Sequence, residues 1–212
     1  MSDKHLDYWN TYYESRGHSP TVPSQFASFV LNEFSDRQDF IDVGCGNGRD
    51  SIFFNNFGKS VLAIDGSEKV IKLNKSVADK FGWNIKFELC DFSSDLSINK
   101  ILKEFKKNYT RPVIHSRFFI HAIGNAEIEK CLDFAQLMMG EQGILCLEYR
   151  TDKDSALEKV TETHFRNYIN PKELEMWIKS RDMKTTYFCE GVGYAKYKTD
   201  DAFVARHIIQ RT

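Results

Sequence analysis

The feature that most constrains the fold of this chain is a regular alternation of short apolar runs and amphipathic segments between residues 39 and 149. The apolar runs are short enough for buried strands, and the first ends in a cluster of glycines. The segments between them carry apolar side chains at helical spacing. Strand and helix alternating in this way predict a parallel sheet with helices on both faces. Strands are expected at 40–43, 60–64, 84–90, 112–115 and 144–149, and helices at 49–57, 68–81, 98–108 and 126–139.

The two ends of the chain depart from this alternation. The amino-terminal part predicts two helices, around 6–15 and 24–34. The tail predicts a helix from Pro171 to about Ser180 and then two consecutive strands, 184–189 and 202–210. Strands with no helix between them pair antiparallel, so the sheet is expected to end in a hairpin at one edge.

Length and charge exclude several classes of protein. The 212 residues fit one domain, and 29 basic against 30 acidic residues give a formal net charge of −1. That balance argues against a nucleic-acid partner. No run approaches the roughly 20 apolar residues that span a bilayer, so no membrane insertion is expected. The five cysteines are scattered, which favours the reducing cytoplasm over a disulfide framework or structural zinc, and we predict no metal site.

The sharpest local motif is the run of residues 42–48, Asp-Val-Gly-Cys-Gly-Asn-Gly, between a predicted strand and a predicted helix. Glycines there allow a tight turn with the backbone close to a ligand, and the helix start offers free N–H donors. Asp65 closes the second strand, where an acid would meet the hydroxyls of a ribose, and Asp91 follows the third. Ligands of open α/β sheets bind at this carboxyl edge, so the three acids predict a nucleoside-containing cofactor.

The motif Asp-Val-Gly-Cys-Gly-Asn-Gly-Arg-Asp, residues 42–50, resembles that of the class I S-adenosylmethionine-dependent methyltransferases, and the resemblance covers nearly the whole chain. It implies a Rossmann-like α/β fold with a seven-stranded, mostly parallel sheet, helices on both faces and an antiparallel last strand. It implies S-adenosyl-L-methionine as the cofactor. A dinucleotide fingerprint would need a third glycine where Arg49 stands, which counts against a nicotinamide cofactor.

The same resemblance implies a role for each matching position. Gly44, Gly46 and Asn47 would border the methionine part of the cofactor, and Asp42 would lie near its amino group. Asp65 would hold the ribose hydroxyls, with Gly66 and Ser67 along the nucleoside. Asp91 and the backbone N–H of Phe92 would contact the adenine, and Ser116 would lie near the sulfonium. In similar methyltransferases the leading helices cover the cofactor, which makes Tyr13, Arg16, Ser24 and Gln25 candidates to contact it or the substrate.

The segments around the fourth and fifth strands should indicate the chemical class of the methyl acceptor. Residues 115–121, His-Ser-Arg-Phe-Phe-Ile-His, lack the Asn/Asp-Pro-Pro-aromatic motif of methyltransferases that act on nucleic-acid amines. Arg117, Arg150, Arg166 and Lys196 are instead expected at the same rim. Guanidinium groups bind phosphate and carboxylate bidentately, so they predict an anionic acceptor. The open alternative is that these cations pair with Glu148, Glu190 or Asp200.

Two histidines are candidates for proton transfer. His121 is the better placed, and it shares a helix face with Arg117 if residues 117–121 begin a helix. His164 is the second candidate. If the acceptor is already an anion, we expect His121 to donate a hydrogen bond rather than act as a base.

We therefore predict a cytoplasmic methyltransferase that methylates an oxygen of a small anionic or glycan acceptor, either a sugar hydroxyl or a terminal phosphate-type group. Residues 116–121 and 204–206 also resemble, less specifically, bacterial methyltransferases of cell-surface polysaccharide modification. The single domain would comprise a helical lid (1–36), a cofactor-binding core (37–150) and a carboxyl-terminal helix and strand pair (151–212). A nicotinamide-dependent oxidoreductase and an inactive, cofactor-binding subunit of a partner enzyme remain alternatives. The oligomeric state stays open.

Overall fold

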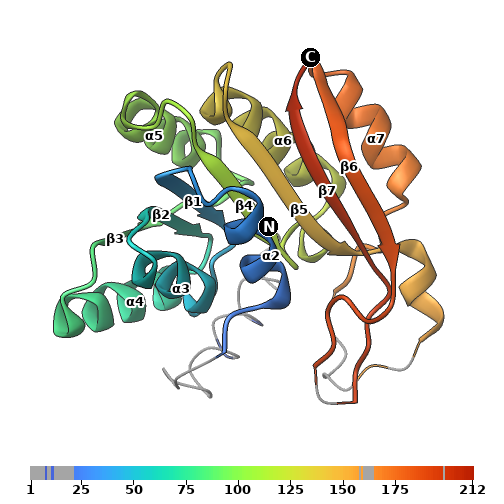
Figure 1. The fold of residues 1–212 in the computed structure, drawn as a ribbon, viewed down its shortest axis with the longest axis horizontal. Coiled ribbons are helices and arrows are strands. Elements are labelled where there is room, and N and C mark those ends of the chain that lie inside the picture. Colours follow the sequence, from blue (N-terminus) through green and yellow to red (C-terminus); the bar gives the residue numbers. More distant parts are fainter. Residues whose placement is uncertain (1–7, 9–10, 12–21, 158, 160–164, 198) are drawn as a thin grey trace.

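The computed structural model describes residues 8, 11, 22–157, 159, 165–197 and 199–212. The described residues form one seven-stranded sheet in the order β3-β2-β1-β4-β5-β7-β6. The strands are β1 (Asp39–Val43), β2 (Ser60–Asp65), β3 (Ile85–Leu89), β4 (Val113–Arg117), β5 (Ile144–Arg150), β6 (Met183–Gly191) and β7 (Val204–Arg211). The first five are parallel, whereas β7 runs antiparallel to both β5 and β6. The predicted fold class and the hairpin at one edge of the sheet are thus confirmed (Figure 1).

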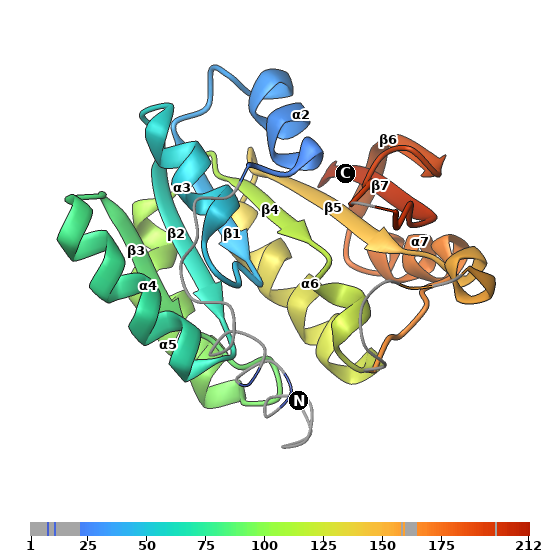
Figure 2. The ribbon, with the colours of Figure 1, turned by 90° about the horizontal axis from the view of Figure 1, so that it is seen from below.

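Helices cover both faces of the sheet, as Figure 2 shows for α2 and α3 on one side and α6 and α7 on the other. The α-helices are α2 (Gln25–Glu33), α3 (Arg49–Asn56), α4 (Glu68–Phe81), α5 (Asp95–Phe105), α6 (Asn125–Met139) and α7 (Pro171–Lys179). Short 3-10 helices are η1 (Lys106–Asn108), η2 (Ile120–Ala122) and η3 (Asp152–Ala156). No helix in the described part of the chain is long and apolar enough to cross a membrane.

Two hydrophobic cores follow from the alternation of side chains along each strand. Ile41 and Val43 of β1 pack with helices α5, α6 and α7, whereas Phe40 packs with α2, α3 and α4. Because successive side chains of a strand point to opposite faces, one apolar run can serve both cores. This explains why the central strands are buried at nearly every position.

Local signals fixed most helix boundaries. Ser24 caps α2 by accepting a hydrogen bond from the N–H of Ala27 at 2.9 Å, and Ser67 caps α4 through the N–H of Val70. Gly82 ends α4 in the left-handed conformation that glycine adopts without steric cost. The first predicted helix, around residues 6–15, lies outside the described residues except for Tyr8 and Thr11.

Candidate active site

The glycine-rich loop joins β1 to α3 at the carboxyl edge of the sheet. Gly44, Gly46 and Gly48 all have positive φ, at 73°, 52° and 74°, a conformation that disfavours other residues. At Gly44 there is a second constraint, because an added Cβ would lie 2.4 Å from the ring of Phe119. The N–H of Gly44 donates to the carbonyl of Ile64 at 2.8 Å, which ties the loop to the end of β2. The loop therefore presents bare backbone at this edge.

Asp65 fixes the loop from the neighbouring strand. Its Oδ2 accepts the N–H of Gly46 at 3.0 Å, and its Oδ1 accepts the N–H of Ser67 at 2.9 Å. Burial raises the pKa of Asp65, while the N–H groups of Ser67, Gly46 and Gly66 act in the opposite direction. A carboxylate has about four acceptor positions and three N–H groups act on Asp65, so it retains the capacity to accept a further hydrogen bond. Asn47 is half-buried in the same loop.

Asn74 is a loop-holding residue that the sequence analysis missed. Its Nδ2 donates to the carbonyl of Gly46 at 2.8 Å, and the side chain is buried. Its Oδ1 has no hydrogen-bond partner among the described residues. The available signal was its position: Val70, Asn74 and Ala78 follow each other at helical spacing on the buried face of α4.

Asp42 lies beneath the loop rather than facing its open side. The side chain is buried, its Oδ2 accepts the hydroxyl of Ser51 at 2.5 Å, and its Oδ1 lies 2.8 Å from Nδ1 of His115. Both oxygens are therefore bonded within the protein. The carboxylate thus joins α3 and β4 to the strand below the loop, and its expected contact with the amino group of a cofactor stays a prediction.

The third strand leads into a turn that Asp91 organises. Its two oxygens accept the N–H and hydroxyl of Ser93 at 2.9 and 2.8 Å. The next residue, Phe92, is buried, and its ring lies 5.6 Å from that of Phe119. Burial, the largest cause, and the nearby carboxylates raise the pKa of Cys90 to about 12, so this thiol stays neutral. Phe92 and Phe119 thus form an apolar floor between the glycine loop and Asp91.

The end of β4 turns sharply at Phe118, which has a φ of 55°. Such a conformation in a bulky residue is strained and persists only where the surroundings hold it. Ser116 just before it is buried, and its hydroxyl has no partner among the described residues. The expectation that Arg117 and His121 share a helix face is wrong, because Arg117 ends β4 and His121 lies in the 3-10 helix η2.

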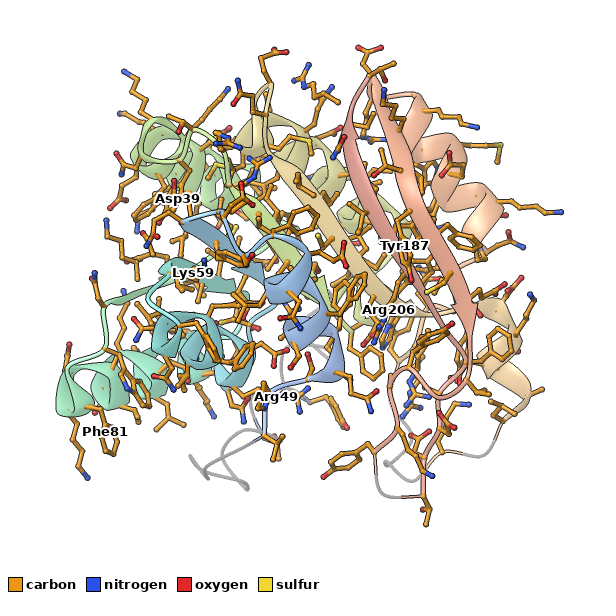
Figure 3. All side chains as sticks on the ribbon, viewed as in Figure 1. Asp39, Arg49, Lys59, Phe81, Tyr187 and Arg206 are labelled. Atoms are coloured by element: carbon orange, nitrogen blue, oxygen red, sulfur yellow. The ribbon has the colours of Figure 1, made fainter. Side chains whose placement is uncertain are left out.

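Arg117 and Arg206 share a single buried carboxylate, that of Glu148. The Nε of Arg117 donates to Oε1 and the Nε of Arg206 to Oε2, both at 2.8 Å. Burial, and after it repulsion by Arg49, lowers the pKa of Arg117, while Glu148 raises it. Figure 3 shows Arg206 on the side of the sheet that α2 covers. Its guanidinium lies 5.0 to 5.4 Å from the ring centroids of three aromatic residues, Phe26, Phe29 and Tyr194.

Arg150 is paired with acids instead of facing a pocket as a free cation. Its Nη1 donates to Asp154 at 2.7 Å and its Nη2 to Asp200 at 2.8 Å. Burial alone would lower the pKa of Arg150, but these two hydrogen-bonded carboxylates raise it. The expectation that Arg150 adds positive charge to an acceptor pocket is therefore corrected: it anchors η3 and the segment before β7.

His121 is buried with a defined hydrogen-bonding role. Its Nδ1 accepts the backbone N–H of Arg150 at 3.2 Å, and its ring packs edge-on against Phe118 at 5.1 Å. In a neutral imidazole only one nitrogen carries the proton, so Nε2 is the donor. This geometry favours His121 as a hydrogen-bond donor rather than as the base.

The remaining predicted residues are dispersed. Gln25 is exposed in the first turn of α2, Arg166 is half-buried, and Lys196 is exposed between β6 and β7. Tyr13, Arg16 and His164 lie outside the described residues, so their roles stay predictions. Within the described ranges, no three His, Cys, Asp or Glu side chains are grouped to hold a metal ion.

Asp50 joins the start of α2 to the helix that follows the glycine loop. Its oxygens accept the N–H of Ser24 at 2.8 Å and the hydroxyl of Ser24 at 2.7 Å. The Nε of Arg49 lies 3.4 Å from its Oδ1. Ser24 thus caps α2 and binds this buried carboxylate, and its expected contact with a ligand stays a prediction.

These residues fit an adenosyl amino acid. The glycine loop carries no side chain at three positions of positive φ, Asp65 keeps acceptor capacity, and the hydroxyl of Ser116 is buried without a partner in the described part of the chain. A glycine turn at the carboxyl edge beside an acid at the end of the next strand is the arrangement that binds nucleotide-like cofactors.

Comparison with known proteins agrees with this geometry. The chain is similar to a structure of an S-adenosylmethionine-dependent methyltransferase from Anabaena variabilis, with 18% identity, 98% of this chain and 95% of that chain covered, and a TM-score of 0.71. It is similar to one from Clostridium acetobutylicum, with 11% identity, coverage of 99% and 98%, and a TM-score of 0.66. The [4+2]-cyclase SpnF shares the fold as well, with 10% identity, coverage of 92% and 84%, and a TM-score of 0.69.

At these identities the structural likeness establishes the fold alone. No curated protein sequence matches the chain significantly. The family model described as "Methyltransferase domain" matches residues 34–189, which is most of the chain. This match favours the methyltransferase over the nicotinamide oxidoreductase. The chain therefore belongs to this methyltransferase domain family, with S-adenosylmethionine as its cofactor.

Proposed function

We propose that this protein transfers the methyl group of S-adenosylmethionine to an oxygen of a small molecule or glycan that carries an anionic group. The observation that supports the acceptor class is the sharing of Glu148 by Arg117 and Arg206. Two guanidinium groups meet one carboxylate, so one positive charge is left uncompensated beside the carboxyl ends of β4 and β5. An anionic substrate would compensate it.

The protein's part in the reaction is mainly to position the reactants. The bound cofactor supplies an electrophilic methyl group on a sulfonium. The glycine loop, Asp65 and Ser116 hold the cofactor, and the apolar floor of Phe92 and Phe119 helps to exclude water. Holding the nucleophile in line and dry accounts for much of the rate enhancement in such a displacement.

Arg117 and His121 would hold the acceptor. The guanidinium of Arg117 binds its anionic group, and the Nε2–H of His121 donates a hydrogen bond to it. A phosphate or carboxylate oxygen is already ionised at neutral pH, so its methylation needs no general base. A sugar hydroxyl would need one, and His121 is ill suited to that role while its Nδ1 accepts the N–H of Arg150. The geometry thus favours the phosphate-type oxygen over the hydroxyl.

The test uses labelled S-adenosylmethionine, the purified chain and matched acceptors that differ only in charge, such as a sugar phosphate and the neutral sugar. We expect label to enter the phosphorylated member. Arg117→Gln should raise the KM for that acceptor, and Arg117→Lys should restore part of the loss. Preference for the neutral member would contradict the anionic acceptor.

A second candidate is a cofactor-binding protein that does not itself transfer methyl groups. The similarity to a [4+2]-cyclase supports keeping it, since that protein has the same fold and another reaction. If the purified chain binds S-adenosylhomocysteine but labels no acceptor until a partner protein is added, this candidate replaces the first.

A further inference from the structure

Arg49 directly follows the glycine loop and is the first residue of α3. Figure 3 shows it beside the lower end of α2. Its Nε lies 3.4 Å from Asp50, and its side chain is 27% exposed, so the guanidinium is held on one side and open on the other. Asp50 is itself held by two hydrogen bonds from Ser24, which fixes the carboxylate against which Arg49 rests.

Arg117 is held in a similar way on the neighbouring strand. Its Nε donates to Glu148, its guanidinium carbon lies 4.1 Å from the ring centroid of Phe118, and its side chain is 16% exposed. Among the described residues, no hydrogen-bond partner is found for the terminal nitrogens of either Arg49 or Arg117. Each arginine therefore uses its Nε for a structural carboxylate and keeps its two terminal nitrogens for another acceptor.

The two arginines lie at the same edge of the sheet, because Arg49 follows the loop at the end of β1 and Arg117 ends β4, the strand that pairs parallel with β1. Burial raises the pKa of Asp50, but His115, Arg49, the N–H of Ser24 and Arg117 bring it below its ordinary value, and Arg49 adds to burial in lowering the pKa of Arg117. Arg49 lies against Asp50, and Arg117 and Arg206 share Glu148, so in these contacts three arginines meet two buried carboxylates. Like charges held together in this way are costly unless an anion joins them, and two arginines offer the forked donors that match an oxyanion.

We propose that Arg49 and Arg117 form a binding site for one oxyanion, a carboxylate or phosphate group, beside the glycine loop at the carboxyl edge of β1 and β4. The site rests on the proposed function for its use of Arg117 and extends it to Arg49. Two molecules at this edge could supply the oxyanion: the amino-acid end of the cofactor or the anionic acceptor. The chemistry of recognition is the same in both cases, so ligands that carry or lack the group separate them.

The test compares wild type, Arg49→Gln, and Arg111→Gln as the control. Arg111 is an exposed arginine near the opposite end of β4, and its substitution removes the same charge. Calorimetry measures the affinity for S-adenosylhomocysteine, which carries the amino-acid carboxylate, and for 5′-methylthioadenosine, which lacks it. Thermal shift then measures stabilisation by inorganic phosphate in protein saturated with S-adenosylhomocysteine. Unliganded melting temperatures show that each variant folds.

If the cofactor supplies the oxyanion, Arg49→Gln should weaken binding of S-adenosylhomocysteine by about 10-fold or more, the scale of one charged hydrogen-bonding partner, and leave 5′-methylthioadenosine unchanged. If the acceptor supplies the oxyanion, Arg49→Gln should bind both adenosyl ligands with the affinity of the wild type. Inorganic phosphate should then no longer raise the melting temperature of this variant. Arg49→Lys should retain part of either effect. An Arg49→Gln variant that matches Arg111→Gln in all three measurements overturns the proposal. These are binding measurements, so they stand even if no methyl transfer is detected.

Discussion

The cofactor edge of this sheet and the proposed acceptor edge are built from different interactions. At the cofactor edge, formed by the glycine loop and the ends of β1 to β3, backbone N–H groups of Gly44 and Gly46 bond to Ile64 and Asp65. At the acceptor edge, formed by the ends of β4, β5 and β7, buried side-chain ion pairs hold the structure. Glu148 joins residues 31 and 58 positions away in the sequence.

The difference explains what each edge requires of the sequence. Every residue except proline carries an N–H, so the glycine loop needs a conformation that glycine can adopt, which leaves a fixed motif, while Asp65 and Asn74 hold the loop through their side chains. An ion pair needs two residues that meet in space, wherever they lie in the chain. The motif of the glycine loop is therefore local in sequence, whereas the ion pairs around Glu148 are not.

The largest expected effect comes from breaking the acceptor edge alone. Glu148→Gln would leave two buried guanidinium groups without their carboxylate, at a cost of about 3–5 kcal/mol in the free energy of unfolding. Urea denaturation at pH 7 measures the loss. Glu68→Gln, which breaks the exposed Glu68–Lys72 pair, is the control and should change nothing measurable. Equal stability of the two variants would refute the assignment of Glu148 as a structural bridge.

A change of pH tests the stability of the acceptor edge independently of Glu148. His207 of β7 lies 3.0 Å from the hydroxyl of Tyr149, and burial lowers its pKa from 6.5 to about 4. The folded state thus favours neutral His207. Its contribution is complete above pH 6.5 and is lost as the pH falls towards 4, by about 3 kcal/mol in total. Denaturation curves of wild type and His207→Gln from pH 8 to 4 should converge in that window; parallel curves would argue against the shift.

A matched pair of glycine variants tests the packing of the cofactor edge. Gly44 and Gly58 have φ of 73° and 74°, but only at Gly44 would a Cβ overlap another side chain. Gly58→Ala therefore measures the cost of the conformation, and Gly44→Ala should lose about 1–3 kcal/mol more through overpacking against Phe119. Calorimetry should find weaker binding of S-adenosylhomocysteine for Gly44→Ala alone. Equal losses would mean that Phe119 moves aside freely.

The smallest effect provides a baseline away from both edges. Asp182, in the turn between α7 and β6, has a φ of 51°. Asp182→Gly relieves the left-handed strain but adds freedom to the unfolded chain, for a net gain of about 0.5 kcal/mol. Thermal unfolding should detect it without any change in ligand binding. A loss of stability would mean that the Asp182 side chain makes a stabilising contact.

The residues of the two edges could be predicted from the sequence to different extents. The order of strands and helices, the glycine loop and the positions of Asp65 and Asp91 followed from periodicity and spacing. The open alternative, pairing of the cations with Glu148 or Asp200, holds for Arg117 and Arg150, whereas Asp154, four residues after Arg150, was not predicted as its second partner. The bend at Phe118 also left no signal, since no rule places a bulky residue at positive φ. Spacing alone had suggested a helix there.

The sharing of Glu148 also limits how this sequence can change over generations. Replacing Arg117, Glu148 or Arg206 singly leaves a buried charge badly compensated, whereas well-packed apolar residues in place of all three could be tolerated. Substitutions at these positions should then appear together or not at all. If residues 117, 148 and 206 covary among relatives, the relatives that keep all three residues should share this edge of the sheet and the proposed acceptor.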